Sequence, residues 1–191
     1  MRWIFDWIVD FMEENGSIDH KYRDVYVYAV QTVFVYIFNI LSGVAIGIAM
    51  GEVLPCILFL IAVIPLREHA GGYHASGWVS CYFLSCMVLV LALMWGKINF
   101  TGQSHMTLTA AMLAGAYVFG EAPLEDENKP LEEDEKKRIG KKAKIIVCME
   151  IITGTMLLYW ERKFAYAVLS AVNWCGIGLL TWHVKKKCVK K

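Results

Sequence analysis

Six apolar runs occupy most of this chain and constrain its fold more than any other feature. They cover Val25–Met50, Val53–Leu66, Trp78–Trp95, Met106–Phe119, Ile145–Trp160 and Phe164–Val184. A helix needs about 20 apolar residues to span a bilayer, so the first, third and sixth runs are long enough. The other three are short, and they would either span with tilt and snorkelling flanks or re-enter the membrane. Hydrophobic residues make up 57% of the 191 residues, which exceeds the roughly 45–50% of soluble domains.

We therefore expect an all-α integral membrane protein with about six transmembrane helices, which form a single polytopic domain over residues 1–191. The basic residues favour full spans and one orientation. With the N-terminus inside, all but three of the 19 Lys and Arg residues fall in cytoplasmic segments. Such a bias follows the positive-inside rule. The sequence thus predicts a multi-pass cell-membrane protein whose termini and loops 67–81 and 121–144 are cytoplasmic.

Residues 1–24 are expected to form an N-terminal amphipathic helix and a linker. The helix covers residues 1–14, and Asn15-Gly16 ends it. Its apolar face has helical spacing and consists of Trp3, Ile4, Trp7, Ile8 and Phe11. The opposite face is acidic, whereas helices that lie on lipid usually carry a basic face. Two interpretations stay open, because the helix suits either the membrane interface or a docking site on the protein's own body.

The loop 67–81 is polar and rich in glycine, and it holds His74 and, just inside the next apolar run, Cys81. A thiol is a useful nucleophile only as a thiolate, which an adjacent base or a helix N-terminus favours. On one continuous helix, residues seven apart lie about 10.5 Å apart along the axis, too far for a hydrogen bond. His74 must therefore fold back on its loop to act as the base. The alternative is a buried cysteine beside an interfacial histidine.

Other polar residues admit further interpretations. Zinc is a competing chemistry for His69, His74, Glu68 and Cys81, but the two histidines are five apart and not four as in HExxH. No metal or other cofactor is expected. Arg67 could snorkel or bind a carboxylate. Gln31, inside the first run, could join helices, orient a histidine or bond an oxyanion. No partner is apparent for the remaining histidines, His20, His105 and His183.

The loop 121–144 is the only long hydrophilic segment. Its first half is acidic and contains Pro123 and Pro130, while residues 136–144 are basic and are expected to begin the fifth membrane helix. One interpretation is a solvated loop with a topology anchor. The other is a binding surface for a charged peptide, in which Lys136, Lys137 and Arg138 contact the substrate.

Two stretches resemble the signature of the accessory gene regulator B (AgrB) family. They are Arg67-Glu-His-Ala-Gly-Gly-Tyr-His74, followed by Cys81, and Ala122-Pro-Leu-Glu-Asp-Glu-Asn-Lys-Pro-Leu131 after the fourth run. The order of the runs is similar too, so the resemblance covers nearly the whole chain. It implies a bacterial membrane cysteine endopeptidase, with His74 as catalytic base and Cys81 as nucleophile. Gln31 and Arg67 fall where family members carry matching residues, as candidate supporting groups.

The resemblance also implies the reaction and the partners. Such an enzyme cuts the C-terminal tail from an AgrD-type propeptide and closes the rest into a cyclic autoinducing peptide, a thiolactone or lactone used in quorum sensing. The expected partners are that propeptide and membrane lipid, with a homodimer as a candidate assembly and no nucleic acid. A small peptide transporter or exporter without proteolytic activity remains the alternative, because short, interrupted spans are common in transporters.

Overall fold

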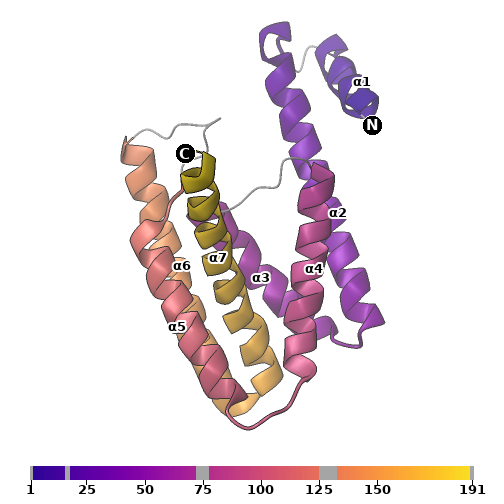
Figure 1. Cartoon of the computed structure of the whole chain (residues 1–191). Helices are drawn as coiled ribbons and strands as arrows, with labels where there is room; N and C mark the ends of the chain where they lie inside the picture. Colours follow the sequence, from indigo (N-terminus) through magenta and orange to yellow (C-terminus); the bar gives the residue numbers. More distant parts are fainter. Residues whose placement is uncertain (1, 16–17, 72–77, 125–132, 190–191) are drawn as a thin grey trace. The chain divides into compact units, whose positions relative to one another are not determined.

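The computed structural model describes residues 2–15, 18–71, 78–124 and 133–189, and every regular element in them is a helix (Figure 1). The α-helices are α1 (Arg2–Glu14), α2 (Arg23–Ala49), α3 (Val53–Ala70), α4 (Trp78–Lys97), α5 (Gln103–Glu121), α6 (Glu133–Trp160) and α7 (Arg162–Val189). A short 3-10 helix, η1 (His20–Tyr22), precedes α2. Each apolar run of the sequence thus forms one helix, from α2 to α7.

Five of these helices, α2, α3, α4, α6 and α7, are long and apolar enough to cross a membrane by length and composition. The helix α5 is not in this group, since its first turn carries the polar residues Gln103, Ser104 and His105. Its 19 residues would measure about 28 Å, close to the thickness of a bilayer core. The predicted all-α membrane architecture with an N-terminal amphipathic helix is confirmed.

Contacts divide the chain into two units, Met1–Ser42 and Gly43–Lys191. In the first unit, α1 packs on the first part of α2 through the buried side chains of Phe5, Val9 and Val27. The guanidinium of Arg23 donates a hydrogen bond of 2.7 Å to the carboxylate of Asp10. The acidic side of α1 therefore forms an ion pair within the chain, with the start of α2.

The apolar face that the sequence predicts for α1 is not the docking face. Trp7 is 65% exposed and Phe11 is 59% exposed, and their rings stack with centroids 6.4 Å apart. The helix docks through Phe5 and Val9, which lie on the other side of α1. An exposed aromatic face beside a docked, ion-paired face suits a helix that lies in the membrane interface.

In the second unit, α7 is the central helix and packs against α3, α4, α5 and α6. The apolar stretch of α7 is 61% buried inside the protein, whereas the apolar stretches of the other candidate membrane spans are 28% buried or less. Small residues permit this close packing. A Cβ at Gly154 of α6 would lie 2.6 Å from a methyl group of Leu169, and one at Gly176 of α7 would lie 2.7 Å from Cβ of Ala114. A larger side chain at either glycine would push α7 away from its neighbour.

The helices of the second unit alternate in direction, so their ends gather in two places. At one end, here called the Cys81 end, lie the last turns of α3, α5 and α7 and the first turns of α4 and α6 (Figure 1). At the other, here called the Arg162 end, the side chain of Lys163 pairs with Glu52 at 3.2 Å and that of Lys97 bonds the Met50 carbonyl at 2.6 Å. The described parts of the predicted loops 67–81 and 121–144 lie at the Cys81 end.

The predicted loop 67–81 is shorter in the structure than in the sequence analysis. The helix α3 continues past Pro65 to Ala70 and ends where Gly71 adopts a left-handed φ of 78°. Cys81 lies in the first turn of α4, as predicted. The basic residues 136–144 are helical, as the sequence predicts, and α6 begins three residues before them, at Glu133.

Candidate active site

Cys81 is half-buried in the first turn of α4, as the fourth residue of that helix. The positive end of the helix dipole favours an anion at such a position. The hydroxyl of Ser85, one turn further along α4, donates a hydrogen bond of 2.9 Å to the backbone carbonyl of Cys81. This bond does not involve the Cys81 thiol. The thiol is thus held at the end of a long helix, near the boundary between helix and loop.

Arg67 is the described side chain that meets this thiol. It lies in the last turn of α3, is half-buried, and places Nη2 at 4.0 Å from the Sγ atom of Cys81. A guanidinium next to a cysteine favours the thiolate by Coulomb attraction and donates hydrogen bonds to it. Of the two residues that the sequence analysis offered as supporting groups, Arg67 is therefore brought to Cys81.

The remaining candidates are placed differently. His74 lies outside the described residues. Gln31 is half-buried on α2 in the first unit, whereas Arg67 and Cys81 belong to the second. The side chain of His69 is engaged within α3, since its Nδ1 lies 2.9 Å from the Pro65 carbonyl. Among the described residues, no group of three or more His, Cys, Asp and Glu side chains is arranged to hold a metal ion.

The candidate substrate-binding residues begin α6 at the Cys81 end. Lys137 and Arg138 are exposed, and Lys136 is half-buried. Three acidic residues, Glu133, Asp134 and Glu135, form the first turn of the same helix, where they complement its dipole. The exposed cations thus lie one turn inside the helix, on the same end of the unit as the thiol.

A short segment without regular secondary structure, Ala122-Pro123-Leu124, contacts the end of α3, and we call it the strap. The amide of Leu124 donates to the Ala70 carbonyl at 3.0 Å. A Cβ at Gly71 would lie 3.0 Å from Cβ of Leu124, so only glycine fits there without displacement. On its other side the strap packs on Gly140 of α6, where a Cβ would lie 2.9 Å from Cδ of Pro123.

The strap brings two distant stretches of the sequence into contact. It consists of the first residues of the second resembling stretch, and it contacts Ala70 and Gly71 in the middle of the first. Ala70 and Gly71 follow Arg67 by one turn and precede the segment with His74. A fixed strap therefore holds the end of α3, and with it the position of the Arg67 guanidinium.

Sequence reasoning missed the side chains that fasten the strap. His183 of α7 places Nε2 at 3.2 Å from the carboxylate of Glu121 and Nδ1 at 3.0 Å from the hydroxyl of Tyr117. No partner for His183 was apparent in the sequence, because its partners are more than 60 residues away. The one available signal is that Tyr117 and Glu121 are four apart and share a helix face. The pair ties the last residue of α5, next to the strap, to the central helix.

The fold and the site define a class, an all-helical polytopic membrane protein with a thiol and a guanidinium at one end of its helices. The accessory gene regulator B family model matches residues 6–184, and the chain belongs to this family. It is 22% identical over 169 residues to the protein named AgrB-like protein 2 of Clostridium perfringens strain 13 / Type A, covering 84% of this chain and 79% of that protein. An AgrB-like protein of C. perfringens strain SM101 / Type A is 24% identical over 180 residues, with coverage of 85% and 83%. No solved structure matches the chain. Family membership places the protein in the accessory gene regulator system.

Proposed function

We propose that this chain is a membrane cysteine endopeptidase that cuts the C-terminal tail from an AgrD-type propeptide and cyclises the remainder. The observation that carries the proposal is the 4.0 Å contact between the Arg67 guanidinium and the Cys81 sulfur in the first turn of α4. A guanidinium and a helix N-terminus both favour a thiolate, and a thiolate is the form that attacks a carbonyl. A transporter has no need for this arrangement.

The first half of the reaction is acyl transfer to the enzyme. The Cys81 thiolate attacks the carbonyl of the scissile peptide bond and gives a tetrahedral oxyanion. The C–N bond then breaks, and the leaving amine of the tail takes a proton from His74, which acts as general acid after having served as base. The product is a thioester between the propeptide and Cys81.

The second half closes the ring. A thiol or hydroxyl group inside the bound propeptide loses its proton to His74 and attacks the thioester carbonyl. The C–S bond to Cys81 breaks, which restores the thiolate and releases a thiolactone or a lactone. Exchange of one thioester for another is nearly balanced, whereas conversion of an amide to a thioester is uphill, so removal of the tail must draw the reaction forward. Water must be excluded, because hydrolysis would consume the intermediate.

The other residues receive roles as parts of the same proposal. Arg67 stabilises the Cys81 thiolate before the first step and again when the second step releases it, and the strap and the Glu121–His183 pair hold the end of α3 that carries Arg67. Lys136, Lys137 and Arg138 bind the charged tail. Gln31 remains a candidate for orienting the base or the oxyanion.

The orientation follows from charge, and it also stays a proposal. The basic ends of α6 and α7 lie at the Cys81 end, while Lys97, Arg162 and Lys163 lie at the Arg162 end. The positive-inside rule then puts Cys81 and both termini on the cytoplasmic side. Lipid contact and a homodimer stay predictions in the same way.

Co-expression with the small open reading frame next to this gene tests the activity directly. Mass spectrometry should detect a peptide that lacks the C-terminal tail. Its mass should be lower by one water than that of the linear peptide cut at the same bond. The Cys81→Ser variant should yield none, with the membrane level of the protein unchanged. If Cys81→Ser still supports cyclic product, the endopeptidase proposal fails. If the wild-type chain only moves an uncut peptide across the membrane, the transporter alternative is correct.

A further inference from the structure

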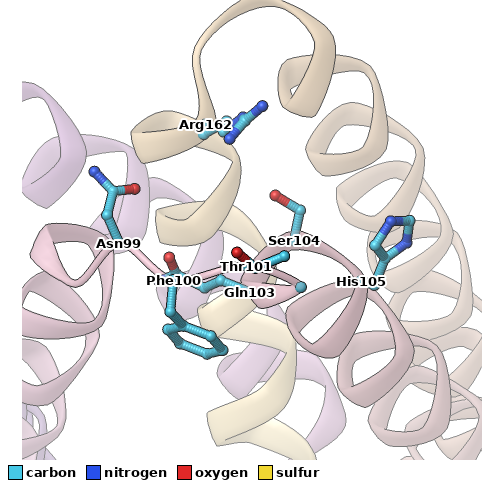
Figure 2. A pocket seen from close by; sticks show the side chains of 8 residues that line it. Asn99, Phe100, Thr101, Gln103, Ser104, His105 and Arg162 are labelled. Carbon is cyan, nitrogen blue, oxygen red and sulfur yellow. The ribbon is translucent and has the colours of Figure 1, made fainter.

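The Arg162 end of the helices holds a polar hollow that the proposed activity does not use. It has a volume of about 550 Å³ and lies between the α4–α5 connection, the first turn of α5 and the first residue of α7 (Figure 2). Its lining residues are Asn99, Phe100, Thr101, Gly102, Gln103, Ser104, His105 and Arg162. In Figure 2 the side chains of Ser104 and Arg162 face the same space, with Asn99 and His105 at its two sides. Cys81 lies near the other end of α4, so the hollow is separate from the candidate active site.

The charge of this hollow favours an anion. The lining contains one guanidinium and one imidazole, and it contains no carboxylate. The two other cations at this end are occupied, since Lys97 bonds the Met50 carbonyl and Lys163 pairs with Glu52. Arg162 forms no ion pair among the described residues. The preceding residue, Glu161, is exposed and does not pair with it. Arg162 is thus the cation of this end that remains for a ligand.

The wall of the hollow is held in place by hydrogen bonds. The Gln103 side chain is only 2% exposed, and its amide nitrogen donates to the Trp95 carbonyl at 2.7 Å. The Trp95 indole donates to the hydroxyl of Thr107 at 3.0 Å, and Ser104 shares a hydrogen bond of 2.8 Å with Tyr166 of α7. The amide oxygen of Gln103 has no partner among the described residues. This oxygen is buried from the hollow, so a ligand does not reach it, and Gln103 serves to hold the wall while the cationic lining meets the ligand.

The surroundings of the hollow are those of a membrane surface. The candidate spans α4 and α7 end and begin there, and aromatic side chains flank it. Tyr159 and Trp160, next to the start of α7, are 91% and 90% exposed, and Phe100 in the lining is 46% exposed. Exposed Trp and Tyr residues concentrate at the level of lipid head groups. A ligand that reaches this hollow from the membrane would be a head group.

We propose that the hollow binds an anionic phosphate ester, with Arg162 on the phosphate. A phospholipid head group such as phosphoglycerol has this chemistry, and so does a soluble glycerol phosphate. Arginine presents a planar fork of N–H groups that matches phosphate oxygens in pairs. Phosphocholine carries the same phosphate beside a quaternary ammonium, so its net charge is zero and its attraction to Arg162 is weaker.

The test uses the purified full-length chain and native mass spectrometry. Phosphatidylglycerol and phosphatidylcholine are added at equal concentrations to the wild type, to Arg162→Gln and to Lys163→Gln. The lysine variant is the matched control, because Lys163 is adjacent and cationic but is paired with Glu52. The wild type should retain phosphatidylglycerol in preference. Arg162→Gln should reduce that retention about fivefold, which corresponds to the loss of one charge-assisted contact, and Lys163→Gln should change it little.

Two results would overturn the proposal. One is equal retention of phosphatidylglycerol by the wild type and Arg162→Gln, and the other is equal retention of the two lipids by the wild type. Competition by soluble glycerol 3-phosphate separates the two sources of the ligand. If it displaces phosphatidylglycerol at equal concentration in an Arg162-dependent way, the hollow is a site for a soluble ester, and if it does not, the site is for lipid. The alkylation rate of Cys81 should be the same in all three proteins, so this test does not depend on the endopeptidase proposal.

Discussion

The Nη2 atom of Arg67 lies 4.0 Å from the Sγ atom of Cys81, and this contact joins the last turn of α3 to the first turn of α4. Two unit charges at that separation attract by about 4 kcal/mol at an effective dielectric constant of 20. Both side chains are half-buried, and measured values for accessible pairs are about 0–1 kcal/mol. We therefore expect a modest but measurable effect of Arg67 on the reactivity of the thiol.

Arg67→Gln should slow the alkylation of Cys81 by iodoacetamide about two- to fivefold near neutral pH. The reason is that the variant lacks the positive charge that stabilises the thiolate, whereas the neutral thiol gains little stability from that charge. Arg67→Lys should fall between the two, since a lysine keeps the charge without the planar fork. The rate is measured in a chain whose other five cysteines are replaced by alanine. Glu68→Gln, at an exposed neighbouring position, is the control, and an equal loss in that variant would remove the specific role of Arg67.

His74→Ala should slow the same alkylation reaction near neutral pH, because the proposed base then no longer takes the proton of Cys81. His69→Ala is the matched control from the same stretch. Its imidazole already bonds the Pro65 carbonyl within α3, so its removal should have a smaller effect. Equal rates in the wild type and His74→Ala would exclude His74 as the base.

The sequence was sufficient for the helices and insufficient for the contacts between them. The apolar runs predict α2 to α7 because the bilayer length imposes a minimum run. The apolar runs alone do not set the helix ends. The basic residues 136–144 were expected to begin the fifth membrane helix, and they do so in α6 because Lys and Arg have good helix propensity and acidic residues begin the helix. Residues Arg67–Ala70 continue α3 up to the left-handed Gly71.

The candidate site shows the same division. Cys81 could be placed in a first helical turn from the order of residues, and the family resemblance named Arg67 as a candidate supporting group. The contact between these two residues could not be predicted from the sequence, since it depends on how α3 and α4 approach each other. The Glu121–His183 pair was missed entirely, because its residues are separated in sequence and join only through the packing of α5 on α7. For α1, the sequence showed the apolar face of the helix. It did not show which side docks, because docking depends on contacts with Arg23 and Val27 of α2.

The Glu121–His183 pair should behave as one unit in a double-mutant cycle. Glu121→Gln and His183→Gln should each lower the midpoint of thermal unfolding of the purified protein, and the double variant should be little worse than either single one. A coupling energy of about 0.5–1 kcal/mol is expected for a half-exposed pair. In propeptide processing, each single variant should reduce kcat more than it raises KM, because the strap acts on the position of Arg67. Strictly additive effects would show that the two side chains do not act together.

The orientation of the chain is tested by cysteine labelling in intact cells, starting from a chain without other cysteines. Positions 128 and 190 should not react with a membrane-impermeant thiol reagent, because the positive-inside rule places them in the cytoplasm. Asn99→Cys is the matched position at the Arg162 end, where residue 99 is exposed, and it should react. Labelling at 128 or 190 would contradict the six-span model with both termini inside.

The basic residues at the start of α6 offer a test of substrate binding. The triple change of Lys136, Lys137 and Arg138 to Gln should raise the apparent KM for the propeptide and leave kcat nearly unchanged. Exposed ion pairs are worth about 0.2–1 kcal/mol each and are screened by salt, so three of them can change KM about tenfold at low salt. Added salt should produce the same loss in the wild type and little further loss in the variant.

The bland alternative is that these cations only anchor the helix at the membrane and touch anionic lipid. The matched control is the change of Lys185, Lys186 and Lys187 to Gln, since these residues lie at the same end, on the last turns of α7. Both triple variants remove three charges from one side of the membrane, so any effect of net charge on insertion or lipid contact should appear in both. Only the α6 variant should raise KM if the tail binds there. An unchanged KM in that variant at low salt, or an equal rise in the two, would assign the α6 cluster to anchoring and leave the tail-binding residues to be sought elsewhere.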